Sequence, residues 1–286
     1  MIKLIPSLFF ISLFYNGCNQ HSKAREISPG YDLSRPEILK MPSSLNELSG
    51  ITFNKGNPDT IYAEQDEEGR LFYFPVASLD VKHRKFGKKG DYEDIAICNG
   101  TVVMLRSDGV LFSFPLNINS DEEISDVQET AGLLPDGEYE GMYADEASGR
   151  LYILCKNCGA DNDTKSISGY ILQMTPGKHI ELKTSFQVNT KDIALKLNEK
   201  KVSFKPSALA KNTRDNQWYI ISSVNKLLVI TDDKWGIKEV YPLDPALFNQ
   251  PEGIAFDKND NLYISNERGS AGNATVLKFT FAKDKK

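Results

Sequence analysis

The 286-residue chain is 40% hydrophobic and 26% charged, with a formal net charge of -5, and these values are ordinary for a soluble globular protein. It is long enough for one large or two ordinary domains with a sizeable core. The negative charge gives no reason to expect a nucleic acid or an anionic membrane surface as a partner. With 15 Phe and 12 Tyr but only two Trp, the composition favours strands over a helical bundle.

Residues 1–18 have the pattern of a secretory signal. Lys3 precedes an apolar run of about 12 residues, which is too short to span a bilayer. The run ends in Phe14-Tyr15-Asn16-Gly17-Cys18, which resembles a bacterial lipobox, although Tyr15 stands where the usual pattern has Leu. We therefore expect a signal peptide cleaved before a lipidated Cys18 and a polar tether over residues 19–35. An ordinary cleaved signal with an incidental cysteine is the alternative.

The rest of the chain contains five copies of one strand pattern, each a strand, a polar turn, a second strand and a third strand. The first strands are predicted at residues 48–53, 92–97, 139–144, 206–210 and 251–256. The second strands are predicted at 61–63, 102–105, 151–154, 218–221 and 262–264, and the third at 71–74, 110–114, 170–174, 227–230 and 275–279. The copies recur roughly every 45 residues, a period typical of propeller blades.

One interval, between the third and fourth copies, is longer than the others. It contains residues 190–197, whose apolar spacing predicts a short helix, and no first-strand pattern lies inside it. We therefore interpret it as an insertion and not as a sixth blade.

The chain ends soon after the third strand of the last copy, which would leave that blade with an exposed edge. Residues 36–41, just before the first copy, can supply the missing outer strand. The sequence thus predicts an all-β, five-bladed β-propeller over residues 36–281, with an N-terminal strand closing the last blade and a tail at 282–286.

Five motifs in this order resemble the SdiA-regulated (YjiK/CarP-like) family of bacterial β-propellers. They are Glu47-Leu48-Ser49-Gly50-Ile51, Asp91-Tyr92-Glu93-Asp94-Ile95, Glu138-Tyr139-Glu140-Gly141-Met142, Lys205-Pro206-Ser207-Ala208, and Gln250-Pro251-Glu252-Gly253-Ile254 with Ile264-Ser265-Asn266-Glu267. The resemblance covers residues 36–281 and implies a five-bladed fold, distantly like NHL-repeat proteins, with a bound calcium ion. It also implies an envelope protein, and it assigns no reaction.

Two columns of side chains are predicted to ring one mouth of the central channel, because the first strand of each blade begins, and the second ends, on the same face. The first column is Ser49, Glu93, Glu140, Ser207 and Glu252, and the second is Asp66, Arg106, Lys156, Ser223 and Glu267. Three glutamates around one axis would repel each other unless a cation balanced them. We expect Glu93, Glu140 and Glu252 to bind calcium and the other seven residues to form a ligand-binding rim. The alternative is a solvated ring that neutralises itself.

Two functions remain open at this rim. The first is an envelope-anchored, periplasm-facing calcium-binding protein that is monomeric and recognises a small ligand or an envelope protein. The second is a metal-dependent hydrolase of lactones, esters or phosphates, broadly similar to gluconolactonase-like and phytase-like propellers, in which the metal and Arg106 and Lys156 polarise a substrate oxygen. No motif places a general base, so whether the protein is an enzyme stays open.

Three further features have simpler interpretations. Cys155 and Cys158 have redox or metal spacing but no second pair, which favours a local disulfide over an active dithiol. Residues 257–261 begin like a calcium loop but lack its later ligands, which favours a hairpin turn. The basic run at 82–89 is expected to be a solvated loop between the first two repeats.

Overall fold

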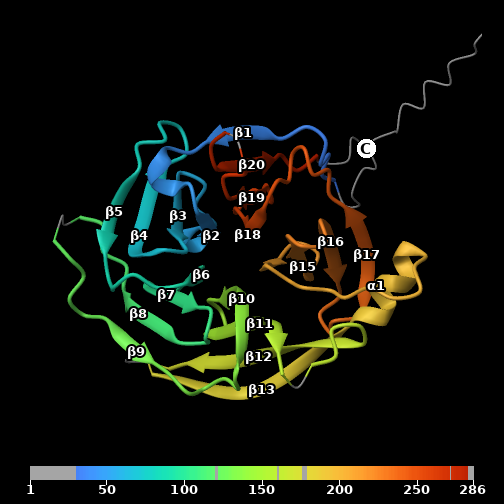
Figure 1. The fold of residues 1–286 in the computed structure, drawn as a ribbon. Helices are drawn as coiled ribbons and strands as arrows, with labels where there is room; N and C mark the ends of the chain where they lie inside the picture. The colour runs from blue at the N-terminus through green and yellow to red at the C-terminus, as the bar shows by residue number, and fades with distance from the viewer. Residues whose placement is uncertain (1–29, 120–121, 160, 176–178, 271, 283–286) are drawn as a thin grey trace, which may run out of the picture.

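The computed structural model describes residues 30–119, 122–159, 161–175, 179–270 and 272–282. Its strands form five antiparallel four-stranded sheets arranged around a central axis (Figure 1). The prediction of an all-β, five-bladed propeller is confirmed. The predicted signal peptide, Cys18 and most of the tether and tail lie outside the described residues.

Four blades use their strands in chain order from the axis outward, and the last blade takes its outer strand, β1, from the start of the propeller. The innermost strands are β2 (Leu48–Thr52), β6 (Tyr92–Cys98), β10 (Gly137–Asp145), β14 (Ala208–Asn212) and β18 (Pro251–Phe256). The second strands are β3 (Thr60–Gln65), β7 (Thr101–Arg106), β11 (Arg150–Cys158), β15 (Gln217–Ser222) and β19 (Leu262–Asn266). The third strands are β4 (Glu68–Pro75), β8 (Leu111–Pro115), β12 (Ser166–Met174), β16 (Leu227–Thr231) and β20 (Thr275–Phe279). The outer strands are β5 (Lys82–Lys85), β9 (Gln128–Thr130), β13 (Ile180–Asn189), β17 (Ile237–Pro242) and β1 (Glu37–Lys40).

The ring is closed by the N-terminal strand, as predicted. β1 pairs antiparallel with β20, so that Leu39 lies opposite Val276. Tyr31 also packs in the core and its hydroxyl donates a hydrogen bond to the Asp260 carbonyl over 2.5 Å. The end of the segment predicted as a tether is therefore part of the folded unit. The Tyr31 side chain packs among apolar residues between the last two blades.

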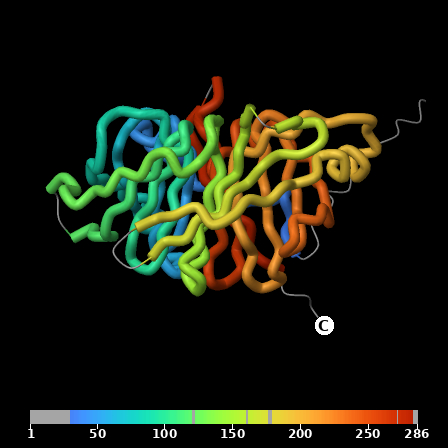
Figure 2. Tube along the Cα trace, turned by 90° about the horizontal axis from the view of Figure 1, so that it is seen from below, coloured from blue at the N-terminus to red at the C-terminus, as the bar shows by residue number. Residues whose placement is uncertain are grey.

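The long third interval contains one helix, α1 (Thr190–Leu197), at the predicted residues. The Asn189 side chain accepts a hydrogen bond from the Lys191 amide at its N-terminus, and Asn198 ends it in the left-handed conformation. Ile193 is fully buried against the blade formed by β14–β17. Figure 2 shows α1 at one side of the disc, next to the long strand β13.

The prediction for the basic run was wrong in part, because residues 82–85 form the outer strand β5 and not a loop. β5 pairs with β4, which places His83 opposite Phe72. Arg84 is buried and donates hydrogen bonds to the carbonyl oxygens of Glu122 and Asn117. An outer strand faces solvent on one side, so four polar residues can form it without an apolar pattern.

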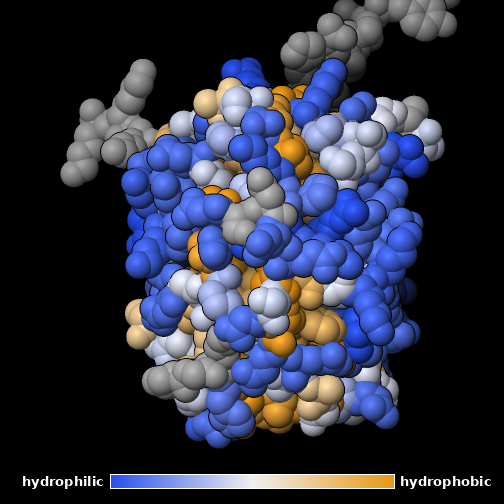
Figure 3. Space-filling view, turned by 90° about the vertical axis from the view of Figure 1, so that its left-hand side faces the viewer, coloured by the Kyte–Doolittle hydropathy of each residue, from blue (hydrophilic) through white to orange (hydrophobic). Residues whose placement is uncertain are grey.

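The core lies between the blades, in apolar clusters formed by the facing sides of neighbouring sheets. On the face shown in Figure 3 the outer surface is mostly hydrophilic, with apolar patches between the polar regions. Among the described residues, no helix has the length and apolar character needed to cross a membrane.

Replacement of Leu39 with alanine should test the closure. Leu39 is 7% exposed on β1, whereas its neighbour Ile38 is 49% exposed on the same strand. We expect Leu39→Ala to lower the free energy of unfolding by about 2–4 kcal/mol because it leaves a cavity in the last blade. Ile38→Ala should change it by less than about 0.5 kcal/mol. Urea unfolding of both variants measures the difference, and equal losses would contradict closure through β1.

Candidate functional site

The innermost strands of four blades, β2, β6, β10 and β18, have a register shift near their start, and in the last three the extra residue is a glutamate. In β6, Tyr92 pairs with Arg106 and Asp94 with Leu105, which leaves Glu93 without a partner residue. In β10 and β18 the shifts fall between Tyr139 and Gly141 and between Pro251 and Gly253. The extra residues there are Glu140 and Glu252. A β-bulge of this kind inserts one unpaired residue and re-aims its side chain.

Residues of both predicted columns line a cavity of about 320 Å³ at one end of the channel. Five predicted residues line it: Glu140, Lys156, Ser207, Ser223 and Glu252. Lys205, Val224, Lys226 and Gln250 complete the lining. We call this end of the channel, with Asp66, Glu93, Glu140, Glu252 and Glu267, the acidic mouth.

The two predicted serines of the first column connect neighbouring blades. The Ser49 hydroxyl donates to the Glu93 carbonyl over 3.0 Å, and the Ser207 hydroxyl donates to the Pro251 carbonyl over 2.8 Å. Both side chains are 3% exposed. They hold the strands that carry the glutamates at fixed separations.

Lys156 is a lysine of the acidic mouth that is paired with carboxylates. Its ammonium group forms ion pairs with Glu140 and, at 3.3 Å, with Glu138. Burial lowers the pKa of Lys156, but the Glu140 and Glu138 carboxylates outweigh this effect and hold it above its usual value.

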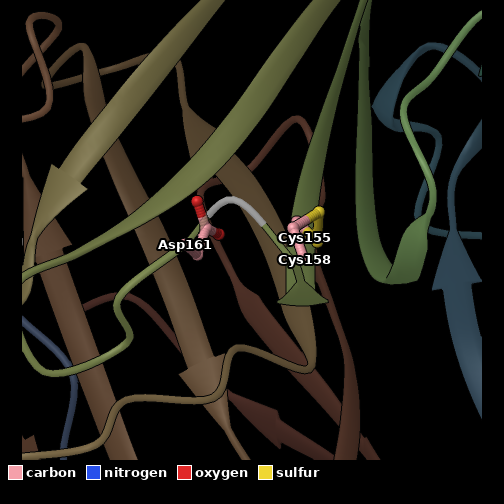
Figure 4. Close-up of side chains that lie close together, drawn as sticks. All are labelled: Cys155, Cys158 and Asp161. Carbon is pink, nitrogen blue, oxygen red and sulfur yellow. A yellow bond between two sulfur atoms is a disulfide. The ribbon is translucent and has the colours of Figure 1, made fainter.

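The residues on either side of Lys156 and Asn157 form the disulfide Cys155–Cys158, as favoured from the sequence. It lies at the end of β11, with Asp161 on the loop that follows (Figure 4). The ligand atoms of Cys155, Cys158 and Asp161 lie within 4.8 Å of one another. Because the two sulfur atoms are bonded to each other, they offer no thiolates to a metal. The disulfide therefore constrains the chain around Lys156.

Arg106 is directed differently from the prediction. Its guanidinium group forms a bidentate pair with Asp108, at 2.9 and 2.8 Å, and lies over the Phe112 ring. It is not among the residues that line the mouth cavity. Asp108 lies two residues away on the β7–β8 turn. Its carboxylate binds the guanidinium group and so competes with the inward orientation that the sequence pattern indicated.

Burial raises the pKa of the carboxyl groups at the acidic mouth. For Glu93, burial and then Glu140 and Asp91 raise the pKa to about 9. Burial raises the pKa of Glu140 to about 8, although Lys156 opposes the shift. Burial and then Glu252 and Asp66 raise the pKa of Glu267 to about 8. Burial also raises the pKa of Glu252, against a hydrogen bond from Ser223. With pKa values of about 8 to 9, Glu93, Glu140 and Glu267 hold protons near neutral pH or require a cation.

The carboxylate oxygens that come closest together are those of Glu47, Asp66 and Glu267, all within 4.8 Å of one another. Burial, and then Glu47 and Glu67, raise the pKa of Asp66 to about 6. Its Oδ1 atom is buried without a hydrogen-bond partner. The predicted trio Glu93, Glu140 and Glu252 is not such a compact group among the described residues. Its assignment as a calcium site stays a prediction.

Two buried carboxyl groups beside the mouth were not predicted. Glu64 is fully buried; its Oε1 accepts a hydrogen bond from the Gly50 amide over 2.6 Å and its Oε2 has no partner. Asp94 accepts hydrogen bonds from the amides of Ile95 and Met142, which connects two blades. Burial raises the pKa of both groups well above the usual range. Asp94 follows Glu93 directly in the sequence. Two adjacent acidic residues within a predicted strand were the one feature that could have indicated a buried carboxyl group here.

The fold and the acidic mouth together define a five-bladed propeller with a charged site at one end of its channel. A model of the SdiA-regulated family matches residues 170–269. Together with the five blades, this match confirms the resemblance to that family. No protein with a curated description matches the chain.

Solved structures show the same fold at low sequence identity. A Myxococcus xanthus glutaminyl cyclase has a TM-score of 0.57 and 11% identity, with 86% of this chain and 96% of that chain covered. A luciferin-regenerating enzyme has a TM-score of 0.55 and 11% identity, with coverages of 86% and 95%. A calcium-binding regucalcin from Agrobacterium tumefaciens has a TM-score of 0.51 and 14% identity, with coverages of 88% and 95%. At these identities the similarity shows the fold alone.

The raised pKa values predict an unusual dependence of stability on pH. A carboxyl group with a raised pKa in the folded state favours folding at low pH, and this contribution is lost as pH rises through the folded pKa. Without metal ions, the melting temperature should therefore fall between pH 5 and pH 9. Glu93→Gln should reduce this fall, because it removes the group whose pKa is about 9.

Thermal melts in EDTA from pH 5 to pH 9 provide the measurement. The control is Glu239→Gln, which changes an exposed glutamate on β17. A melting temperature that rises from pH 5 to pH 9 would contradict the raised pKa values. The same pH dependence of the melting temperature in the wild type and in Glu93→Gln would contradict the raised pKa of Glu93.

Proposed function

We propose that the protein binds a calcium ion at the acidic mouth and holds a small anionic ligand in the adjoining cavity. The observation that carries the proposal is the convergence of Asp66, Glu93, Glu140 and Glu267, whose pKa values are raised by burial and by neighbouring carboxyl groups. A divalent cation would relieve this repulsion and return the carboxyl groups to their ionised form.

The donor set fits a hard cation. Calcium takes six to eight oxygen ligands, including carboxylates, carbonyls and water, in flexible geometry. Glu47, Asp66 and Glu267 offer a compact set of oxygens, and Asp66 contributes a buried atom that lacks a partner. Glu93, Glu140 and Glu252 add negative charge from three further strand ends.

The cavity beside these carboxylates supports the anionic ligand. Lys226 lies in its wall and donates to the Asn249 carbonyl over 2.6 Å, and burial lowers its pKa. Lys205 lies in the same wall and pairs with Asp163 at 3.1 Å. These ammonium groups, with a cation bound nearby, would attract an anion of a size suited to about 320 Å³. We further propose that a lipid on Cys18 anchors the protein in a bacterial envelope.

A metal-dependent hydrolase at the same mouth is the second candidate. It is favoured by Glu140, whose pKa of about 8 suits proton transfer near neutral pH. The Lys156 ammonium group beside it would stabilise the ionised form of Glu140. In this candidate the ion would polarise a substrate oxygen.

Calcium should raise the melting temperature of the wild-type protein at pH 8. At a concentration a hundred times the dissociation constant, the expected rise is about 5–10 °C for a chain of this size. Asp66→Asn/Glu267→Gln and Glu93→Gln/Glu140→Gln/Glu252→Gln should each remove most of the rise, because they remove ligands or the surrounding charge. Retention of the full rise in both variants would exclude calcium from the mouth, and Glu239→Gln serves as the exposed control.

The hydrolase candidate has a separate test. Calcium-loaded and chelated protein would be assayed with a lactone, an aryl ester and phytate. Calcium-dependent turnover that Glu140→Gln abolishes, with an unchanged circular dichroism spectrum, is the result that the hydrolase requires. Absence of turnover on all three, together with calcium binding, supports the ligand-binding protein.

A further inference from the structure

The opposite end of the channel contains a second and larger cavity, of about 400 Å³. It lies where the hairpins between the first and second strands turn, and all five innermost strands contribute to its wall. Its inner part is apolar, with Ile95, Ala96, Met142, Leu209 and Ala255 among the lining residues. Its rim carries Lys55, Lys211 and Lys258 together with four acidic residues.

The acidic residues of this rim already have partners. Asp257 accepts hydrogen bonds from the amides of Asn259 and Asn261 and from the Asn261 side chain. Asp260 pairs with Arg214 at 3.7 Å. These two carboxylates are therefore held by groups of the protein itself.

The other two acidic residues are the last residue of β10 and the first residue of the turn that follows, and they are held in the same way. Asp145 accepts from the Ala147 amide and from the Ser148 hydroxyl. Glu146 accepts from the Asn99 amide over 3.1 Å. Each of the four carboxylates therefore already has at least one partner within the protein.

The lysines of the rim are in the opposite situation. Lys55 and Lys258 are both exposed, and within the described parts of the chain neither has a carboxylate within 4.0 Å of its ammonium group. Lys211 lies over the Trp218 ring at 5.1 Å. The Lys258 amide donates to the Gly56 carbonyl over 2.8 Å, so the turns that carry Lys55 and Lys258 touch across the first and last blades.

We propose that this cavity binds a small amphiphilic anion, with its apolar body in the channel and its carboxylate or similar head between Lys55 and Lys258. Both parts of the fit are required. Burial of the ligand's apolar body in the cavity removes apolar surface from water and so favours binding. The two ammonium groups bind the anionic head with charge-assisted hydrogen bonds. A body of about eight carbon atoms suits a cavity at the small end of the ligand-pocket range. The site is separate from the acidic mouth and does not depend on calcium.

The turns that carry Lys55 and Lys258 are held close together by a glycine. Gly56 has a φ of +65°, and a Cβ atom there would lie 2.9 Å from the Lys258 amide nitrogen. A side chain at position 56 would therefore separate the two turns. The close contact keeps the two lysines next to each other at the rim.

Octanoate, octylammonium and 1-octanol are matched probes for the full chain, titrated by calorimetry in EDTA at pH 7. We expect octanoate to bind at least about tenfold more tightly than either of the other two, since only its head pairs with the lysines. Shortening the chain from octanoate to hexanoate should weaken binding by about fourfold per methylene, because each buried methylene contributes to the apolar transfer.

Lys55→Gln/Lys258→Gln should weaken octanoate binding by about tenfold or more, whereas Lys191→Gln/Lys196→Gln on the exposed face of α1 should leave it unchanged. Ala144→Leu narrows the cavity and should weaken octanoate without affecting calcium. The proposal is overturned if octanoate does not bind, if octylammonium binds equally well, or if both lysine variants behave alike. Loss of calcium binding alone would overturn the function proposed for the mouth and leave this site intact.

Discussion

The extra residue at the start of the innermost strands is the constraint on which the rest of the site depends. Without a bulge, residues 93, 140 and 252 would each pair with a residue of the second strand. Their side chains would then follow the regular alternation between the two faces of the sheet. The inserted residue instead stays unpaired, and in β6, β10 and β18 it is a glutamate. Three blades thus direct a carboxylate to the same end of the channel while the strands beyond the bulge retain their apolar packing.

The cost of that arrangement is visible in the electrostatics of the mouth. Lys156 is paired with Glu140 and Glu138, and the pKa of Glu140 is still raised to about 8. Glu93 and Glu267 form no ion pair with a lysine or arginine among the described residues. Buried carboxyl groups without cations lower the stability of a fold, and this is the reason for which we propose a cation among them. The serine bonds between blades keep the groups in place when they are not neutralised.

The sequence predicted the architecture well because each propeller blade repeats the same order of strands and polar turns. The five first strands and the helix α1 follow from patterns that are local in the chain, and the closure by β1 follows from the outer strand that the last copy lacks. The outer strand β5 escaped prediction because Lys82-His83-Arg84-Lys85 has no apolar alternation, and its pairing with β4 decides its conformation. The site was predicted only in part. Which rim residues point inward depends on bulges and on local partners such as Asp108 for Arg106, and Glu64 is buried by a neighbouring blade that the local sequence does not show.

Calcium titration by calorimetry at pH 6 and at pH 8.5, in two buffers of different ionisation enthalpy, tests the central claim most directly. If the carboxyl groups of the mouth bind the ion, calcium must displace their protons. The predicted result is one site that binds more tightly at pH 8.5 and releases protons at pH 6. Absence of binding, or binding of equal affinity at both pH values without proton release, would contradict the account.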